Sequence, residues 1–241
     1  MTAGEQARES ELATALARLS ERLAAACAAA GRRREDVELL PVTKYFPAGD
    51  TAALYRLGLR AFGESREPEA SRKVAEFASH IDDPSVRWHM IGRLQRNKVR
   101  SVARWAHVVH SVDSLRLADA LDSAAQADRS TPLEVFVQVS LDDDPARGGV
   151  AAAELSALAE RVAAAEHLRL RGLMAIPPLE WEAERAFARL TQLQQQFVRH
   201  FPAATDLSAG MSGDLEQAVK YGSTCVRVGT ALMGPRPLIS Q

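Results

Sequence analysis

Short β-type runs alternate with helical stretches along almost the whole chain, and this alternation constrains the fold more than any other feature. Apolar and β-branched runs predict strands at Val37–Lys44, Ala61–Ser65, Trp88–Gly92, Val108–Asp113, Leu133–Leu141, Leu168–Ile176, Asp206–Ser212 and Cys225–Leu232. Helical patterns lie between them at Asp50–Leu57, Glu67–Ser79, Arg93–Ala103, Ser114–Gln126, Ala151–Ala165, Glu180–Arg199 and Asp214–Tyr221. Strict alternation of this kind is typical of a parallel sheet covered by helices.

Eight such strands in a chain of 241 residues indicate an α/β fold of the TIM type, a closed (β/α)8 barrel. A doubly wound open sheet is the alternative, but no predicted strand is followed by the glycine fingerprint with which that fold binds dinucleotides. An extra N-terminal helix over residues 1–31 has leucines at helical spacing and ends naturally at Gly31. We expect residues 1–241 to form a single domain in which this helix packs on a barrel formed by residues 37–234.

The composition excludes several classes of partner. A net charge of −1 and a pI near 6.6, with both signs interspersed, give no electrostatic basis for binding nucleic acid or a membrane surface. No apolar stretch approaches membrane-spanning length and the first residues lack a signal-peptide profile, so we expect a cytoplasmic protein. Cys27 and Cys225 are expected to be small buried side chains. The acidic run Asp142–Asp144 matches no metal-ligand spacing and is interpreted as part of a solvated loop.

Lys44 ends the first predicted strand and is one of only four lysines, although lysine and arginine together number 30. If Leu40, Val42 and Lys44 share the inward face, the amine lies at the barrel mouth above an apolar floor, where desolvation lowers the lysine pKa. A lysine can then lose its proton and attack a carbonyl to form a Schiff base, which arginine cannot do. The alternative is a strand-end lysine paired with a carboxylate.

The seventh predicted strand runs through small residues, from Ser208 to Ser212, directly into a helix. Hydroxyls and free backbone N–H groups at that point suit a phosphate. The alternative is an ordinary helix N-cap made by Ser212 or Asp214.

The eighth predicted strand places Arg227 and Gly229 on one face. An arginine among β-branched residues is costly without a partner, and Gly229 lets a ligand approach the backbone closely. Arg227 therefore either bridges to a buried carboxylate such as Glu64 or pairs with a ligand. Two weaker candidates are His89, a proton carrier or a hydrogen-bonded core histidine, and Met174, a ring contact or a packed core residue.

Together these runs resemble the pyridoxal phosphate homeostasis protein family. The matching segments occur in family order over nearly the whole chain, at Pro41–Lys44, Phe62–Glu64, Trp88–Gly92, Leu94–Gln95, Asn97–Lys98, His110–Asp113, Gly172–Pro177, Leu207–Ser208, Gly210–Ser212, Gly222–Thr224 and Arg227–Thr230. No single segment is decisive, but the ordered set is highly specific. Ser65 departs from the pattern, because an asparagine usually follows Phe62–Glu64, and this leaves any contact made there open.

The resemblance implies that residues 37–234 form a barrel like the N-terminal domain of alanine racemase, carrying pyridoxal 5'-phosphate. Lys44 matches the family's Schiff-base lysine, which holds the cofactor as an aldimine, and Arg227 matches the arginine that faces the pyridine nitrogen. Positions that hold the phosphate are matched by Ser212, Gly229 and Thr230. Further cofactor contacts are predicted at Met174, His89 and Ser208. A guanidinium beside the ring nitrogen disfavours its protonation, which makes the ring a weaker electron sink.

The resemblance also implies a monomer that buffers pyridoxal phosphate and supplies it to apoenzymes through transient contacts, without catalysis. Few residues follow Gly234, so we expect no second domain of the type that gives a racemase its tyrosine acid/base. Two alternatives remain. One is a pyridoxal-phosphate-dependent amino-acid racemase or related fold-type III enzyme, which needs a base opposite Lys44. The other is a Schiff-base aldolase that acts on a sugar phosphate without a cofactor.

Overall fold

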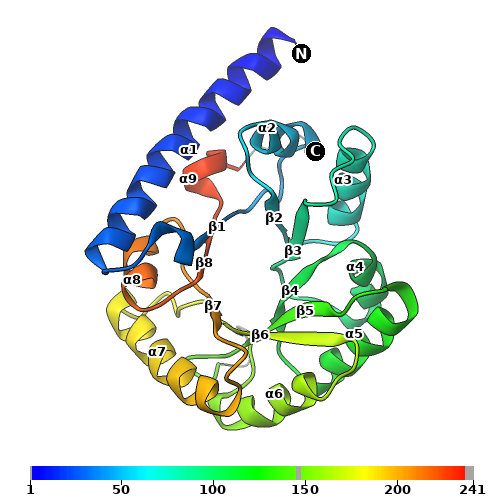
Figure 1. The fold of residues 1–241 in the computed structure, drawn as a ribbon, viewed down its shortest axis with the longest axis vertical. Helices are drawn as coiled ribbons and strands as arrows, with labels where there is room; N and C mark the ends of the chain where they lie inside the picture. Colours follow the sequence, from blue (N-terminus) through cyan, green and yellow to red (C-terminus); the bar gives the residue numbers. More distant parts are fainter. Residues whose placement is uncertain (1, 145–147, 237–241) are drawn as a thin grey trace.

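Eight parallel strands form a barrel ringed by helices in the computed structural model, which describes residues 2–144 and 148–236 (Figure 1). The strands are β1 (Glu38–Pro41), β2 (Ala61–Glu64), β3 (Arg87–Met90), β4 (Val108–Val112), β5 (Leu133–Gln138), β6 (Leu168–Met174), β7 (Asp206–Ser208) and β8 (Cys225–Val228). They pair in the order β1-β8-β7-β6-β5-β4-β3-β2. A bridge between Val42 and Gly63 joins the two ends of this order, so the predicted fold class is confirmed.

The helices follow the strands in the expected alternation. They are α1 (Ala3–Ala29), α2 (Ala48–Arg56), α3 (Glu69–Ala78), α4 (Val99–Trp105), α5 (Leu115–Asp128), α6 (Leu155–Ala163), α7 (Ala183–His200), α8 (Leu215–Lys220) and α9 (Thr230–Met233). Short 3-10 turns lie at Arg34–Asp36, Arg96–Lys98 and Ala152–Glu154. Among the described residues, no helix has both the length and the apolar character that crossing a bilayer requires.

Several strands are shorter than predicted at their C-terminal ends. β1 ends at Pro41 instead of Lys44, and β8 ends at Val228, after which Thr230–Met233 form α9. The chain stays apolar beyond the last ladder hydrogen bonds because these loops still pack on the barrel rim. Hydrophobicity alone therefore overstates strand length at the end of the barrel where chemistry is expected.

Helix α1 packs along the outside of the barrel beside α2, α8 and α9 (Figure 1). Its N-terminus is closed by a capping box, in which Thr2 and Glu5 satisfy each other's backbone N–H groups. The inner face buries Leu12, Leu19 and Leu23, among other residues. Arg8 adds hydrogen bonds to Asp50 and to the carbonyl of Met233, which tie α1 to α2 and α9.

The hydrophobic core has two parts. The larger part lies between the strands and the surrounding helices, and a small separate cluster of Val108, Phe136 and Met174 lies on β4, β5 and β6. Buried polar side chains from β3, β4, β7 and β8 occupy the strands as well, namely His89, His110, Ser208 and Arg227. Buried polar groups of this kind require partners, and the partners lead to the candidate site.

Candidate functional site

A cavity of about 390 Å³ opens beyond the C-terminal ends of the strands. Five of the eight predicted site residues line it, namely Lys44, Ser212, Arg227, Gly229 and Thr230. The remaining lining residues are Val42, Ser65, Ile91, Gly92, Arg93, Gln138, Gly148, Ile176 and Met211. In barrels of this type, ligands bind at this end because the loops that follow the strands meet there.

Lys44 lies in a turn just beyond β1, with its side chain half-buried. The preceding residue, Thr43, is fully buried and fixes the turn through both its side chain and its backbone. Its hydroxyl donates to Glu64 Oε1 at 2.6 Å, and its carbonyl accepts from Lys73 Nζ at 2.8 Å. Tyr45 then takes a left-handed backbone conformation with φ of 72°, which turns the chain toward α2. Lys44 is therefore held at the rim by buried polar contacts on its N-terminal side.

The Glu64–Lys73 pair beneath this turn is a buried ion pair. The two side chains are 2% and 6% exposed, and their charged atoms are 2.7 Å apart. Burial raises the pKa of Glu64, and the neighbouring Lys73 and the Thr43 hydroxyl act in the opposite direction. Glu64 thus has its own cation. The interpretation that Arg227 bridges to Glu64 is wrong.

Arg227 is buried without a carboxylate. The side chain is 5% exposed, and among the described residues no carboxylate lies within ion-pair distance of its guanidinium. Nη1 donates to Ser208 Oγ at 2.7 Å and Nη2 donates to the Ala175 carbonyl at 3.0 Å. Burial lowers the pKa of Arg227. A guanidinium held this way, at the wall of a cavity, has hydrogen-bond capacity to offer an acceptor on a ligand.

A buried hydrogen-bonded chain continues behind Arg227. Ser208 Oγ lies 2.8 Å from His110 Nδ1, and His110 Nε2 lies 2.9 Å from His89 Nδ1. Burial lowers the pKa of His89 to about 3 and that of His110 well below its usual value, so both rings are neutral at neutral pH. Because arginine can only donate, Ser208 Oγ is the acceptor in its bond with Arg227.

Three predicted contacts do not line the cavity. Ser208 accepts a hydrogen bond from Arg227, and His89 is two hydrogen bonds further away, beyond His110. His89 lines a separate cavity with Glu38, Arg87 and Arg171, residues of the opposite end of the barrel. Met174 is fully buried against Val108 and Phe136. His89 and Met174 therefore occupy core positions outside this cavity.

The loops after β7 and β8 form one side of the cavity. Ser212 Oγ accepts from the backbone N–H of Ala231 at 3.3 Å, which ties the two loops together. Ser212 is therefore not the N-cap of α8; that position is Asp214, whose carboxylate accepts from Met211 N at 2.5 Å. Among the described residues, the backbone N–H groups of Gly229 and Thr230 have no acceptor. Free N–H groups and hydroxyls together suit a phosphate.

Sequence reasoning missed other lining residues. Gln138 is a polar residue that closes the apolar strand β5, which is the same signal that identified Lys44. Gly92 follows β3 where the chain passes Ser65, and a Cβ atom at Gly92 would approach the Ser65 Cα to 2.8 Å and its carbonyl oxygen more closely still. Gly92 thus permits the β2 and β3 loops to meet at the cavity wall.

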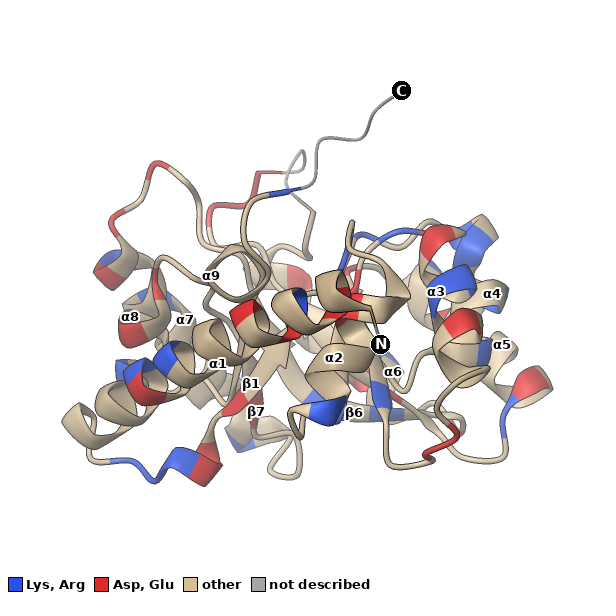
Figure 2. Ribbon diagram, turned by 90° about the horizontal axis from the view of Figure 1, so that it is seen from above, with Lys and Arg blue, Asp and Glu red and all other residues tan. Residues whose placement is uncertain are grey.

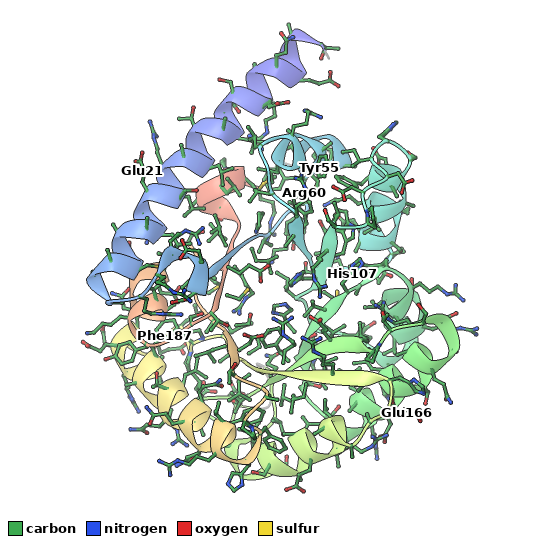
Figure 3. The ribbon with its side chains drawn as sticks, viewed as in Figure 1. Glu21, Tyr55, Arg60, His107, Glu166 and Phe187 are labelled. Carbon is green, nitrogen blue, oxygen red and sulfur yellow. The ribbon has the colours of Figure 1, made fainter. Side chains whose placement is uncertain are left out.

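The cavity lacks a second acid/base group among the described residues. Lys44, Arg93 and Arg227 are its ionisable lining residues there. Tyr55 donates to Asp83 at 2.8 Å and stacks with Arg60 beside α2, outside the barrel (Figure 3). Tyr221 donates to Glu184 at 3.0 Å, and the Tyr45 ring centroid lies 5.7 Å from Lys44 Nζ without lining the cavity. Within the described ranges, no group of three His, Cys, Asp or Glu side chains is placed to hold a metal.

Comparisons with known proteins agree with this geometry. Residues 15–237 match the alanine racemase N-terminal domain family. The chain is 55% identical to the pyridoxal phosphate homeostasis protein of Mycobacterium tuberculosis over 97% of this chain and 96% of that protein. The protein of the same name from Escherichia coli is 39% identical, with 94% and 97% covered.

Solved structures show the same barrel. PipY from Synechococcus elongatus, solved with pyridoxal phosphate bound, superposes with a TM-score of 0.79 at 34% identity, over 92% of this chain and all of that chain. Alanine racemase from Corynebacterium glutamicum has a TM-score of 0.68 at 15% identity, over 97% of this chain but 63% of the racemase. At that identity the racemase shows the fold alone.

Proposed function

Because this chain belongs to the family of pyridoxal phosphate homeostasis proteins, we propose that it holds pyridoxal 5'-phosphate in the cavity at the barrel mouth and supplies the cofactor to apoenzymes. It is a pyridoxal-phosphate-binding protein that acts in the homeostasis of this cofactor.

The observation that carries the proposal is a buried guanidinium and a primary amine in one cavity. Arg227 has no carboxylate partner there, and Lys44 and the hydroxyls of Ser212 and Thr230 line the same space. Pyridoxal phosphate carries three matching groups: an aldehyde, a pyridine nitrogen and a phosphate. Lys44 would hold the aldehyde carbon through its amine, Arg227 would donate to the ring nitrogen, and Ser212, Gly229 and Thr230 would hold the phosphate. When bound, the cofactor supplies an electron-withdrawing ring.

Arg227 would weaken the electron withdrawal of the bound ring. A guanidinium donates and cannot accept, so a ring nitrogen that faces it stays unprotonated. Electron withdrawal by the ring is then weaker than it would be beside a carboxylate. Ser208 and the Ala175 carbonyl hold the guanidinium in place, so the polarity of this contact is built into the barrel.

The residues that line the cavity favour a carrier over a racemase. Racemisation requires proton transfer on both faces of a substrate, hence a second acid/base group opposite Lys44. Among the described residues, no Tyr, His, Asp, Glu or Cys side chain lines the cavity. We therefore propose that the protein has no catalytic turnover of its own.

The test is chemical labelling of the holoprotein. After borohydride reduction, peptide mass spectrometry should find the pyridoxyl adduct on Lys44, and Lys44→Ala should remove both the adduct and the visible absorbance. Lys220→Ala is the matched control, because Lys220 lies at the end of α8, pairs with Glu184 at the surface and does not line the cavity. A protein that gains no chromophore with added pyridoxal phosphate would overturn the proposal and favour a cofactor-free aldolase. Rapid Lys44-dependent exchange of amino-acid α-protons in D2O would favour the racemase.

The proposal also includes transfer of the cofactor to apoenzymes and a monomeric state. We expect the holoprotein to be a monomer by sedimentation at micromolar concentration and to activate a pyridoxal-phosphate-dependent apoenzyme when mixed with it. If activation rises with holoprotein concentration while the free cofactor concentration is held constant, that result would support transfer through transient contact.

A further inference from the structure

A second, larger cavity of about 810 Å³ lies beside the cofactor cavity, between the loops that follow β2, β3 and β4. Ser65 and Arg93 line both cavities, so the two spaces adjoin at these residues. The other lining residues are Arg66, Glu67, Met90, Leu94, Gln95, Arg96, Lys98, Asp113, Ser114, Arg116 and Leu117. We call this space the basic cleft.

The basic cleft has an excess of positive charge. Five cations line it, Arg66, Arg93, Arg96, Lys98 and Arg116, against two carboxylates, Glu67 and Asp113. This excess lies in a chain with a net charge of −1. In Figure 2, basic and acidic positions both lie on and around α3 and α4, so the excess is a property of the residues that line the cleft.

None of the five cations forms an ion pair with a described residue, whereas neighbouring cations do. Arg100 and Arg104 on α4 each lie 3.4 Å from Asp128. Within the cleft, Glu67 accepts hydrogen bonds from Ser71, Ser101 and Trp105 instead of pairing with an arginine. The positive potential of the cleft is therefore not cancelled locally.

The cleft leads toward the reactive end of the cofactor cavity. Arg93 lines both spaces, and the Arg66 guanidinium lies 5.9 Å from the centroid of the Tyr45 ring, next to Lys44. Four of the five cations are arginines with exposed side chains. Exposed, solvated arginines around an open cleft attract an anion over distance and release it readily, in contrast to the buried Arg227.

We propose that the basic cleft captures the phosphate of pyridoxal 5'-phosphate from solution and passes the molecule to the adjoining cavity. The inference rests on the proposed function, since the ligand is the one held at Lys44. The cleft then distinguishes phosphorylated vitamers from unphosphorylated ones through the association rate. Fields of this kind raise association rates by about 10-fold or more at low salt, and a Debye length of about 8 Å at physiological ionic strength weakens them.

The experiment measures association of pyridoxal phosphate with the apoprotein by stopped-flow absorbance. The test variant is the triple substitution R66Q/R96Q/R116Q, which leaves Arg93 in place because it also lines the cofactor cavity. The matched control is R100Q/R104Q/R189Q, which removes three exposed positive charges outside the cleft. The slope of the observed rate against ligand concentration should fall about 10-fold in the test variant at low ionic strength. It should approach the wild-type slope in about 0.5 M salt.

Pyridoxal, which lacks the phosphate, is the second probe. Its association should be equal in wild type, test variant and control, and the test variant should still give the pyridoxyl adduct on Lys44. A test variant as fast as wild type at low salt, or one that slows pyridoxal equally, would overturn the cleft's role and leave the proposed function standing. Failure of the wild type to form the adduct would instead overturn the proposed function. The single variant Arg96→Glu should slow pyridoxal phosphate more than Arg96→Gln, and equal rates for the two would also count against capture.

Discussion

The two ends of the barrel use arginine in opposite ways. At the N-terminal end, Glu134 on β5 pairs with both Arg87 and Arg171, and Arg171 also pairs with Asp206. At the C-terminal end, Arg227 and the arginines of the basic cleft have no carboxylate partner among the described residues. Cations that are neutralised by the fold contribute to stability, and cations that are left unpaired are available to a ligand. The same residue type is therefore paired with carboxylates at one end of the barrel and left unpaired at the end where ligands bind in barrels of this type.

The lysines repeat this contrast within the mouth itself. Lys73 is buried and paired with Glu64, whereas Lys44 lies half-buried at the rim of the cavity. The first lysine holds the Thr43 carbonyl and the second follows Thr43 directly in the chain. The mouth thus contains one paired lysine whose contacts position the lysine that we propose holds the cofactor.

The largest effect is expected from Lys73→Met. It leaves Glu64 as an uncompensated buried charge, and breaking a buried pair in this way costs about 3–5 kcal/mol of unfolding free energy. Urea denaturation measures the loss. The double variant Lys73→Met/Glu64→Gln should recover part of it, because both charges are then gone. A cost below about 1 kcal/mol for the single variant would contradict a structural role for this pair.

Acidification should weaken the barrel through the two neutral histidines that link its ends. The pKa of His89 is about 3 when folded, because burial disfavours the imidazolium and Arg87 and Arg171 add repulsion, and that of His110 is also far below its usual value. Unfolded histidine takes up a proton near pH 6.5, so between that pH and the folded pKa the unfolded state binds more protons. The free energy of unfolding therefore decreases as pH falls.

The expected size is about 1.4 kcal/mol per histidine between pH 7.5 and 5.5. Urea midpoints at the two pH values measure it, and the variant His89→Asn/His110→Asn should show a flatter dependence than wild type. Histidine NMR signals provide the control, since neither ring should titrate down to about pH 4.5. Titration of either ring near pH 6.5 would refute the buried, neutral assignment.

A smaller effect is expected at the N-terminal end from Glu134→Gln. The substitution leaves Arg87 and Arg171 without a shared carboxylate, and partly exposed pairs are worth about 1–2 kcal/mol as a network. Unfolding free energy should fall by that amount while cofactor affinity stays unchanged. Glu160→Gln, at an exposed position on α6, is the matched control. Loss of cofactor affinity in Glu134→Gln would break the separation between the two ends.

The fold could be predicted from sequence because each strand carries its own local signal. All eight strands lie within or close to the predicted segments, since β-branched runs bounded by helical patterns need no tertiary information. Their C-terminal ends could not be placed, as at β8, where Val228 ends the strand and Thr230 begins α9. The sequence there stays apolar while the hydrogen-bond ladder stops.

The site was most readily predicted where a residue is unusual for its position. Lys44 follows the apolar strand β1, Arg227 interrupts the apolar strand β8, and both line the cavity. The contacts that hold them could not be predicted, because barrel register alone brings His110 on β4 to Ser208 on β7, and Lys73 on α3 to the Thr43 carbonyl. The basic cleft combines Arg66 after β2, the cations between Arg93 and Lys98 after β3, and Arg116 on α5, and only the fold brings these segments together.

The smallest effect on stability, and the sharpest test of the contrast between the two ends, is expected from Arg227→Met. Because Arg227 is a buried cation without a carboxylate, replacing it with an apolar side chain of similar length should leave the unfolding free energy of the apoprotein unchanged or slightly higher. Its donor to the ring nitrogen is lost, so affinity for pyridoxal phosphate should fall about 10-fold, which corresponds to one charge-assisted hydrogen bond. Equilibrium titration and urea denaturation of the same preparation measure both quantities, and Arg171→Met at the paired end should give the reverse pattern of lost stability with retained affinity. If Arg227→Met lowered stability as much as Arg171→Met while binding the cofactor normally, both ends of the barrel would use arginine for stability alone.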